Sequence, residues 1–340
     1  MMEIAFNFDR DTQLANESQA FDKVLFVSHM HWHGIRSAVG ALPGHKLCIP
    51  HEGGSLDGSS ARHIIGIIVH HNISHVCFHG FSPVAEWLAR DLKKHFGSDL
   101  GLSVVTHVTS SQFENHFEIE MQRRIQNLQK LGVFRRHGSV KPNFDSVVET
   151  CWARTLINAA PNISPNQFYY AFDPDSVFIP LENTWRKNLY TNIISANALD
   201  QVKRINTVNW PSSLENLLDL SKVRHVGYKR GFELYSTMAS ASVMLGVTLA
   251  ECQPMTELEG LAVGTPTISG QLLLSEFADD ELTKLTRVST GDNPRSISQV
   301  LDSVMNFRRS SPDELQQMIS EHLQKRLKLS FESYRDFLEI

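Results

Sequence analysis

Short apolar runs separated by polar, glycine- and proline-containing segments restrict this chain to an α/β fold. Four such runs, 23–28, 46–50, 75–79 and 102–106, occupy the first third of the sequence. Buried parallel strands have this continuous apolar character, because helices cover both of their faces. Segments with helical periodicity follow the second, third and fourth runs, and strands that alternate with helices indicate βαβ units with a parallel sheet.

The helices expected in the first half run from Ser59 or Ser60, as a cap, to about His71, over 83–96, and from about 112 to 131. The stretch 29–37 is expected to be a polar loop. A proline-rich region over 138–185 has no clear periodicity, and its end is the expected connection between domains.

A second alternating block follows this region. The expected strands are 189–195, 223–227, 242–248 and 266–269, and the expected helices are 198–206, 232–239, 254–263 and 312–338. The fold class predicted is therefore α/β, with two Rossmann-like, doubly wound parallel-sheet domains in tandem. The domains expected are 1–180 and 181–312, with a C-terminal helix over 313–340 that can pack back on the first domain.

The composition of the chain limits the classes of function that it can have. The chain has 340 residues, of which 41% are hydrophobic, enough for two cores. The net charge of −5 gives no global basic field for nucleic acid. Four cysteines lie far apart without a CxxC pair, and no leader or long apolar stretch is apparent. A cytoplasmic protein without a transmembrane segment is expected.

Histidine is distributed unevenly, with 14 of 16 residues before position 140. His29, His31 and His33 alternate after the first strand, where metal-dependent hydrolases place two imidazoles on one side. Such a hydrolase needs further ligands, and the second half offers only His225 and His322. The alternative is a polar cleft without metal, since α/β sheets bind ligands at the carboxyl ends of their strands.

The most distinctive run is Val247–Ile268. A strand leads to Glu251, Pro254 suits the first turn of a helix, and Glu259 lies on that helix eight positions after Glu251. Gly264 closes the helix, and a Thr-Pro pair leads into the next strand.

This run resembles the retaining GT-B glycosyltransferases, in particular glycosyltransferase family 4, whose signature contains E-x7-E between a strand and a G-x-P turn. Glu251 and Glu259 match the two glutamates, and the other positions in register are Ala262, Gly264, Pro266 and Ile268. Pro254 replaces a glycine, and Gly260 stands where alanine is usual.

The resemblance implies two domains facing a cleft, and transfer of a sugar from a nucleotide diphosphate sugar (UDP- or GDP-linked) to a hydroxyl acceptor. It implies retention of configuration, with no metal or other cofactor. The implied catalytic residues are Glu251 facing the donor sugar, His107 on the acceptor side and Lys203 at the phosphates, with Arg204, Arg186 and Arg230 as further cations.

Donor binding is expected from Glu259, whose carboxylate can accept both ribose hydroxyls, and from the helix start, where free N–H groups favour an anion. The remaining donor-binding candidates are Gly34, Gln253, Met255, Thr256 and Arg204. The acceptor side of the cleft is expected to contain His31, His33 and His79, together with His29 and His107.

Three other functions stay open from the sequence: a sugar-nucleotide epimerase, the metal-dependent hydrolase, and a binding module that has lost turnover. The acceptor is open as well, and a glycan, a lipid-linked saccharide, a small molecule, a protein and modified DNA are all compatible. Basic residues in the segment 118–136 leave peripheral membrane binding as an option.

Overall fold

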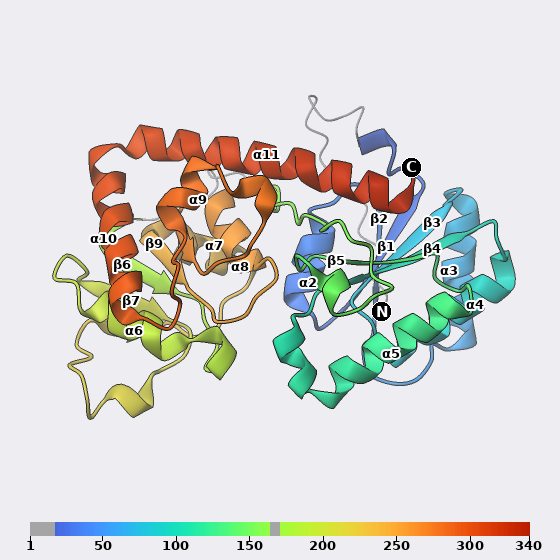
Figure 1. Ribbon diagram of the computed structural model, residues 1–340, viewed down its shortest axis with the longest axis horizontal. Coiled ribbons are helices and arrows are strands. Elements are labelled where there is room, and N and C mark those ends of the chain that lie inside the picture. Colours follow the sequence, from blue (N-terminus) through green and yellow to red (C-terminus); the bar gives the residue numbers. More distant parts are fainter. Residues whose placement is uncertain (1–17, 164–170) are drawn as a thin grey trace. The chain divides into compact units, whose positions relative to one another are not determined.

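The chain divides into two compact units (Figure 1). The computed structural model describes residues 18–163 and 171–340. Unit 1 contains the described residues up to 159 together with 326–340, and unit 2 contains those between 160 and 325. Helix α11 (Pro312–Leu338) begins in unit 2 and ends in unit 1.

Unit 1 is built on a parallel sheet with the strand order β2-β1-β3-β4-β5. Its strands are β1 (Val24–His29), β2 (His45–Ile49), β3 (His75–His79), β4 (Gly101–Thr106) and β5 (Arg136–Ser139). Its helices, besides the end of α11, are α2 (His33–Gly40), α3 (Gly58–His70), α4 (Pro83–Phe96) and α5 (His116–Lys130).

Both faces of this sheet are covered, as the unbroken apolar runs require. Leu25 and Val27 belong to a core that also takes in apolar side chains of α3, α4 and α5. Phe26, between them in sequence, faces the other way and packs edge-on against Tyr334 of α11, with ring centroids 6.1 Å apart. The end of the chain therefore closes the second face of the first sheet.

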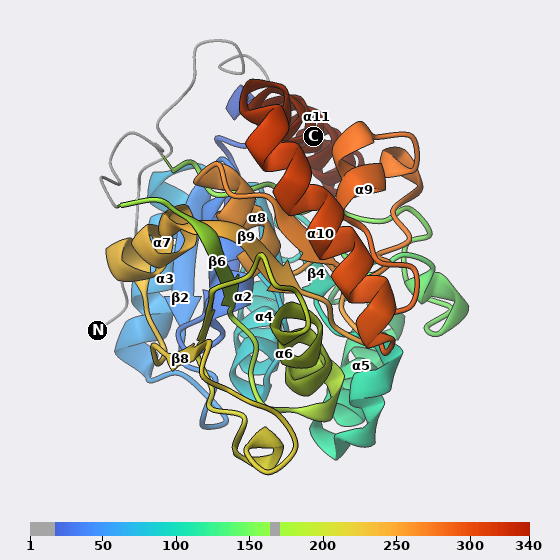
Figure 2. The ribbon, with the colours of Figure 1, turned by 90° about the vertical axis from the view of Figure 1, so that its left-hand side faces the viewer.

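Unit 2 repeats the plan with a parallel sheet of order β10-β9-β6-β7-β8. Its strands are β6 (Asp173–Ile179), β7 (Arg204–Thr207), β8 (Val223–His225), β9 (Ala241–Gly246) and β10 (Thr267–Ser269). Its helices are α6 (Leu189–Asn197), α7 (Gly231–Ser240), α8 (Met255–Ala262), α9 (Glu281–Thr286), α10 (Pro294–Ser310) and the start of α11. Helices α6 and α10 pack together over one face (Figure 2).

These two parallel sheets with flanking helices confirm the predicted α/β class. Several single elements differ from the prediction. The run 189–195 is not a strand but the start of α6, because Leu189, Ile193 and Ala196 recur at helical spacing and are all buried. The helix expected over 198–206 is wrong, because 198–203 form turns and irregular structure and β7 begins at Arg204.

In unit 1 the expected loop 29–37 is partly helical, since α2 begins at His33. Asp57, not Ser59 or Ser60, caps α3, and its carboxylate accepts the N–H groups of both serines. Strand β5 was not predicted, because its sequence, Arg-His-Gly-Ser, has no apolar run.

The division of the chain also differs from the expected boundary at residue 180. Strand β6 lies in the middle of the second sheet, between β9 and β7, so unit 2 begins well before it. The segment expected as a separate helix, 313–340, is shared between the units.

Over the described residues, we find no helix that combines the length and the hydrophobicity needed to span a bilayer. The basic residues of α5 are partly neutralised, because Arg124 forms ion pairs with Glu86 at 3.0 Å and with Glu120 at 2.9 Å.

Gly260→Ala should destabilise unit 2. The added methyl group would lie 2.6 Å from Thr267 Oγ1 and would also overlap Met244 Sδ, and such overpacking costs about 1–3 kcal/mol. Gly34→Ala on α2 is the matched control, because nothing lies within 4 Å of its added Cβ. We expect Gly34→Ala to be neutral or stabilising by up to about 1 kcal/mol. Urea denaturation of both variants checks this, and equal stabilities would contradict it.

Candidate functional site

Glu251 follows β9 and lies at the carboxyl edge of the second sheet. Its carboxylate accepts a hydrogen bond from Arg186 Nη1 at 2.9 Å and forms an ion pair with Lys187. Only 14% of its side chain is exposed. Burial by itself would raise the pKa of Glu251, but the charges of Lys187 and Arg186 outweigh it and lower this pKa. The carboxylate is therefore ionised at neutral pH.

The loop that carries Glu251 is fastened to the segment that carries the two cations. Arg186 Nη1 also donates to the carbonyl of Ala250 at 3.0 Å, and the N–H of Leu249 donates to the carbonyl of Arg186 at 2.9 Å. Asn188 donates from its amide to the carbonyls of Val247 and Gly291. The cluster of one carboxylate and two cations is consequently held in place by backbone contacts.

Helix α8 begins directly after this loop. Pro254 is its N-cap, and the helix starts at Met255. The N–H of Glu257 donates to the carbonyl of Pro254 at 3.1 Å, whereas the N–H groups of Met255 and Thr256 have no acceptor within the helix. Met255 and the preceding Gln253 are buried, and Thr256 is half-buried. With its aligned dipole, this helix start can accommodate an anion.

Glu259 lies in the middle of α8 with 7% of its surface exposed. Burial raises the pKa of Tyr235 of α7, and the charge of the Glu259 carboxylate raises it further. A buried carboxylate at this position suits a ligand that supplies hydroxyl donors.

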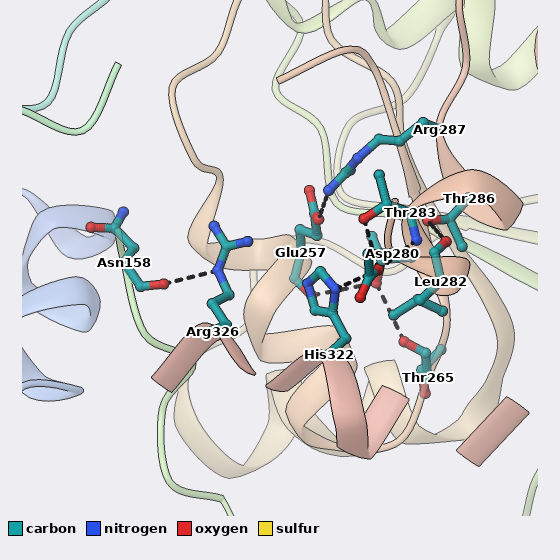
Figure 3. Close-up of polar contacts among 11 residues, drawn as sticks. Asn158, Glu257, Thr265, Asp280, Leu282, Thr283, Thr286, Arg287, His322 and Arg326 are labelled. Carbon is teal, nitrogen blue, oxygen red and sulfur yellow. Dashed lines mark hydrogen bonds and ion pairs between the residues drawn. The ribbon is translucent and has the colours of Figure 1, made fainter. Parts of the chain in front are cut away.

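Two further polar contacts fix the same helix and its neighbours (Figure 3). Glu257 of α8 forms a buried ion pair with Arg287, just after α9, at 2.5 Å. Asp280 caps α9 and accepts a hydrogen bond from His322 Nδ1 of α11 at 2.9 Å. Burial would raise the pKa of Asp280, but the His322 hydrogen bond lowers it to about 2. Polar side chains thus join α8, α9 and α11.

Of the cations expected at the phosphates, Arg186 contacts Glu251, but Lys203 and Arg204 do not lie near it. They stand at the amino end of β7, where Arg204 pairs with Asp173 at 2.7 Å. Glu251 follows the carboxyl end of β9, and all strands of this sheet are parallel, so the two groups occupy opposite edges. The cations that contact Glu251 are Arg186, which was a candidate from the sequence, and Lys187, which was not.

Lys187 was missed because β6 was missed. Pro174 lies near the start of that strand and Pro180 directly follows it, so its apolar run is only a few residues long. Once β6 is located, the basic pair that follows its carboxyl end is the natural candidate, since ligands bind at that edge.

In unit 1, His79 and His107 do meet at the carboxyl ends of β3 and β4. A hydrogen bond of 3.0 Å joins His79 Nδ1 and His107 Nε2. Burial lowers the pKa of His107 to about 3 and that of His79 well below its ordinary value, so both are neutral at physiological pH. His107 can exchange hydrogen bonds with a ligand, but it is a weak base.

The imidazoles of the alternating run do not converge. His29 is buried and hydrogen bonded to Ser82 at 2.8 Å, while His31 contacts His51 at 3.0 Å and His33 contacts Arg36 at 3.1 Å. Among the described residues no group of three or more His, Cys, Asp or Glu side chains is placed to hold a metal ion. Gly34 is exposed in the first turn of α2.

Comparisons with known proteins show which solved structures have a similar fold. No family model and no curated protein matches the sequence. Among solved structures, the Anabaena protein HepE in complex with UDP has a TM-score of 0.62 at 9% identity, over 94% of this chain and 100% of HepE. Sucrose-phosphate synthase from Thermosynechococcus elongatus has a TM-score of 0.60 at 12% identity, over 92% and 98% of the two chains.

A UDP-forming trehalose-phosphate synthase from Burkholderia xenovorans, in complex with glucose-6-phosphate, has a TM-score of 0.56 at 10% identity, over 92% of this chain and 98% of that one. These structures are GT-B glycosyltransferases, and the likeness confirms the predicted GT-B fold. At such identities the shared property is the fold.

The buried histidines make stability depend on pH. Burial lowers the pKa of His29 to about 3, and those of His107 and His137 to about 3 and 4. Below an unfolded-state pKa near 6.5, the unfolded chain binds protons that the folded chain does not. Stability is therefore lost as the pH falls, by about 1.4 kcal/mol per pH unit for each such histidine.

Urea denaturation at pH 7.5 and 5.5 measures this loss. His137→Asn should reduce the difference between the free energies of unfolding at the two pH values by the contribution of one histidine. The control variant His63→Asn changes an exposed histidine and should leave this difference unchanged. Equal stability of the wild type at both pH values would contradict the prediction.

Arg287→Met should destabilise unit 2 by about 3–5 kcal/mol, because it leaves the buried Glu257 carboxylate without its cation. The double variant Glu257→Leu/Arg287→Met should regain most of this loss. Lys284→Met, which removes an exposed ion pair with Glu281, is the control and should leave the thermal midpoint unchanged. Losses in the double variant that simply add would show that the two residues do not interact.

Proposed function

We propose that this protein is a glycosyltransferase that transfers a sugar from a nucleotide diphosphate sugar to a hydroxyl acceptor. The observation that carries the proposal is the cluster of Glu251, Arg186 and Lys187 beside the start of α8, which bears the buried Glu259. We assign donor binding to unit 2 and acceptor binding to unit 1.

Each part of this cluster has a task in the proposed reaction. The N–H groups at the start of α8 donate hydrogen bonds to the diphosphate leaving group. Arg186 and Lys187 neutralise its negative charge without a metal. The Glu259 carboxylate accepts the two ribose hydroxyls. Glu251 faces the donor sugar.

Retention of configuration follows if the acceptor attacks from the face that the phosphate leaves, since the departing phosphate can then take the acceptor's proton. This route needs no separate nucleophile. His107, neutral and hydrogen bonded to His79, orients the acceptor hydroxyl rather than deprotonating it. Membership of glycosyltransferase family 4 is the finer proposal, and it depends on the Glu251 and Glu259 spacing.

The similar structures support a nucleotide-sugar donor. HepE has been solved in complex with UDP and with UDP and glucose, and a trehalose-6-phosphate structure from E. coli is bound with UDP-2-fluoro glucose. A sugar-nucleotide epimerase would also bind such a donor. Release of free UDP or GDP only when an acceptor is present separates transfer from epimerisation.

A thermal-shift panel with UDP, GDP and their glucose conjugates tests donor binding. We expect at least one nucleotide to raise the melting temperature of the wild type, and Glu259→Ala to abolish the shift. Glu281→Ala, on the exposed surface of α9, is the control and should keep it. A full shift in Glu259→Ala would overturn the assignment of the donor site.

Lys187→Met should weaken nucleotide diphosphate binding by about 10- to 100-fold, as expected for a charge-assisted contact to phosphate worth about 1.5–3 kcal/mol. Lys203→Met is the matched control and should bind as the wild type does, because Lys203 stands at the opposite edge of the sheet. Titration calorimetry with UDP or GDP measures both variants. Weaker binding in Lys203→Met alone would contradict this proposal and would support Lys203 as the phosphate-binding residue, as the sequence predicted.

A further inference from the structure

We propose that a pocket in unit 1, beside His107, binds an uncharged hydroxyl-bearing acceptor, a sugar or polyol without a phosphate group. The inference rests on the proposed function and names the acceptor class. The pocket lies at the carboxyl ends of β3 and β4 and is lined by residues of α2 and α5 as well. Its volume is about 200 Å³. Sites for drug-sized ligands begin at about 300 Å³, so this pocket suits a smaller group such as one sugar ring.

Trp32 forms one wall, and the backbone of Gly80 fixes its position. A Cβ at Gly80 would lie 2.6 Å from the Trp32 ring, which excludes a side chain there on steric grounds. The φ of Gly80, +71°, is a second reason, because residues with a side chain rarely adopt it. The indole also packs against His29, with ring centroids 4.0 Å apart. A half-buried indole held in this way presents a rigid apolar surface to one face of a sugar ring.

The polar part of the pocket exchanges hydrogen bonds without charge. Thr106, His107 and Gln122 all line it, and Gln122 Nε2 donates to Thr106 Oγ1 at 3.3 Å. Gln122 is 7% exposed, and its Oε1 has no hydrogen-bond partner among the described residues. Hydroxyl groups, which both donate and accept, complement such a set.

The charges around the pocket disfavour a phosphate. None of the described residues that line it is Lys or Arg, and one of them is Glu118. Glu118 is half-buried, and this burial raises the pKa of its carboxyl group. On α2, Arg36 is already engaged by the carbonyl of Met30 at 2.9 Å and by His33 at 3.1 Å. A phosphate dianion would lose its hydration here without gaining a counter-charge.

The test measures sugar binding to the full chain by saturation-transfer NMR, without donor. The probes are glucose, galactose and mannose and their 6-phosphates. We expect a signal from at least one neutral hexose, at least tenfold weaker binding of its 6-phosphate, and loss of the signal in Trp32→Ala. Trp32→Phe, which keeps an aromatic wall, should retain it. Equal or tighter binding of the 6-phosphate, or no neutral signal, would overturn the proposal.

Two further variants separate this proposal from the rest. Glu259→Ala lies in unit 2 and should leave the hexose signal intact, so a failed donor site and a failed acceptor site give different results. Glu118→Lys should shift the preference at least tenfold toward the 6-phosphate, whereas Glu118→Gln should not. An unchanged preference in Glu118→Lys would show that the pocket charge does not select the acceptor.

Discussion

Parallel strands must be covered on both faces, and the rest of this structure follows from that requirement. Because every strand of each sheet runs in the same direction, the loops after the strands gather at one edge. Glu251 follows β9 and His107 follows β4, so both units place their polar chemistry at such an edge. The same requirement explains why Phe331, Tyr334 and Phe337, at the end of α11, are fully buried against the first sheet.

Two of the buried carboxylates in unit 2 are paired with cations. Glu251 is matched by Arg186 and Lys187, and Glu257 by Arg287. These pairs differ in what they can do. The Glu257 pair is almost inaccessible and fixes α8, whereas the Arg186 and Lys187 side chains are 21% and 22% exposed, so that a ligand can compete for these two cations.

Several histidines of unit 1, in contrast, are buried without a side chain of opposite charge beside them in the part of the chain that the structure describes. His29, His79 and His107 lose their proton affinity and become neutral polar side chains. A titration of these three imidazoles near pH 6.5, the approximate pKa of a free histidine, is therefore not expected. What they provide instead is a set of fixed hydrogen-bonding groups around Trp32 and the pocket beside it.

The sequence by itself determined the fold class and the elements around the Glu251 motif, because apolar runs and a G-x-P turn are local patterns. It also brought His79 and His107 to one edge, since both end predicted parallel strands. It failed over 173–206, where prolines hide β6 and where an apolar run, Leu189–Ser195, fits a strand as well as a helix. Only the tertiary structure decided that Arg186 and Lys187, rather than Lys203, face Glu251. Pairing of a buried carboxylate depends on strand order and direction in the folded sheet, and neither is recorded in the spacing of residues along the chain.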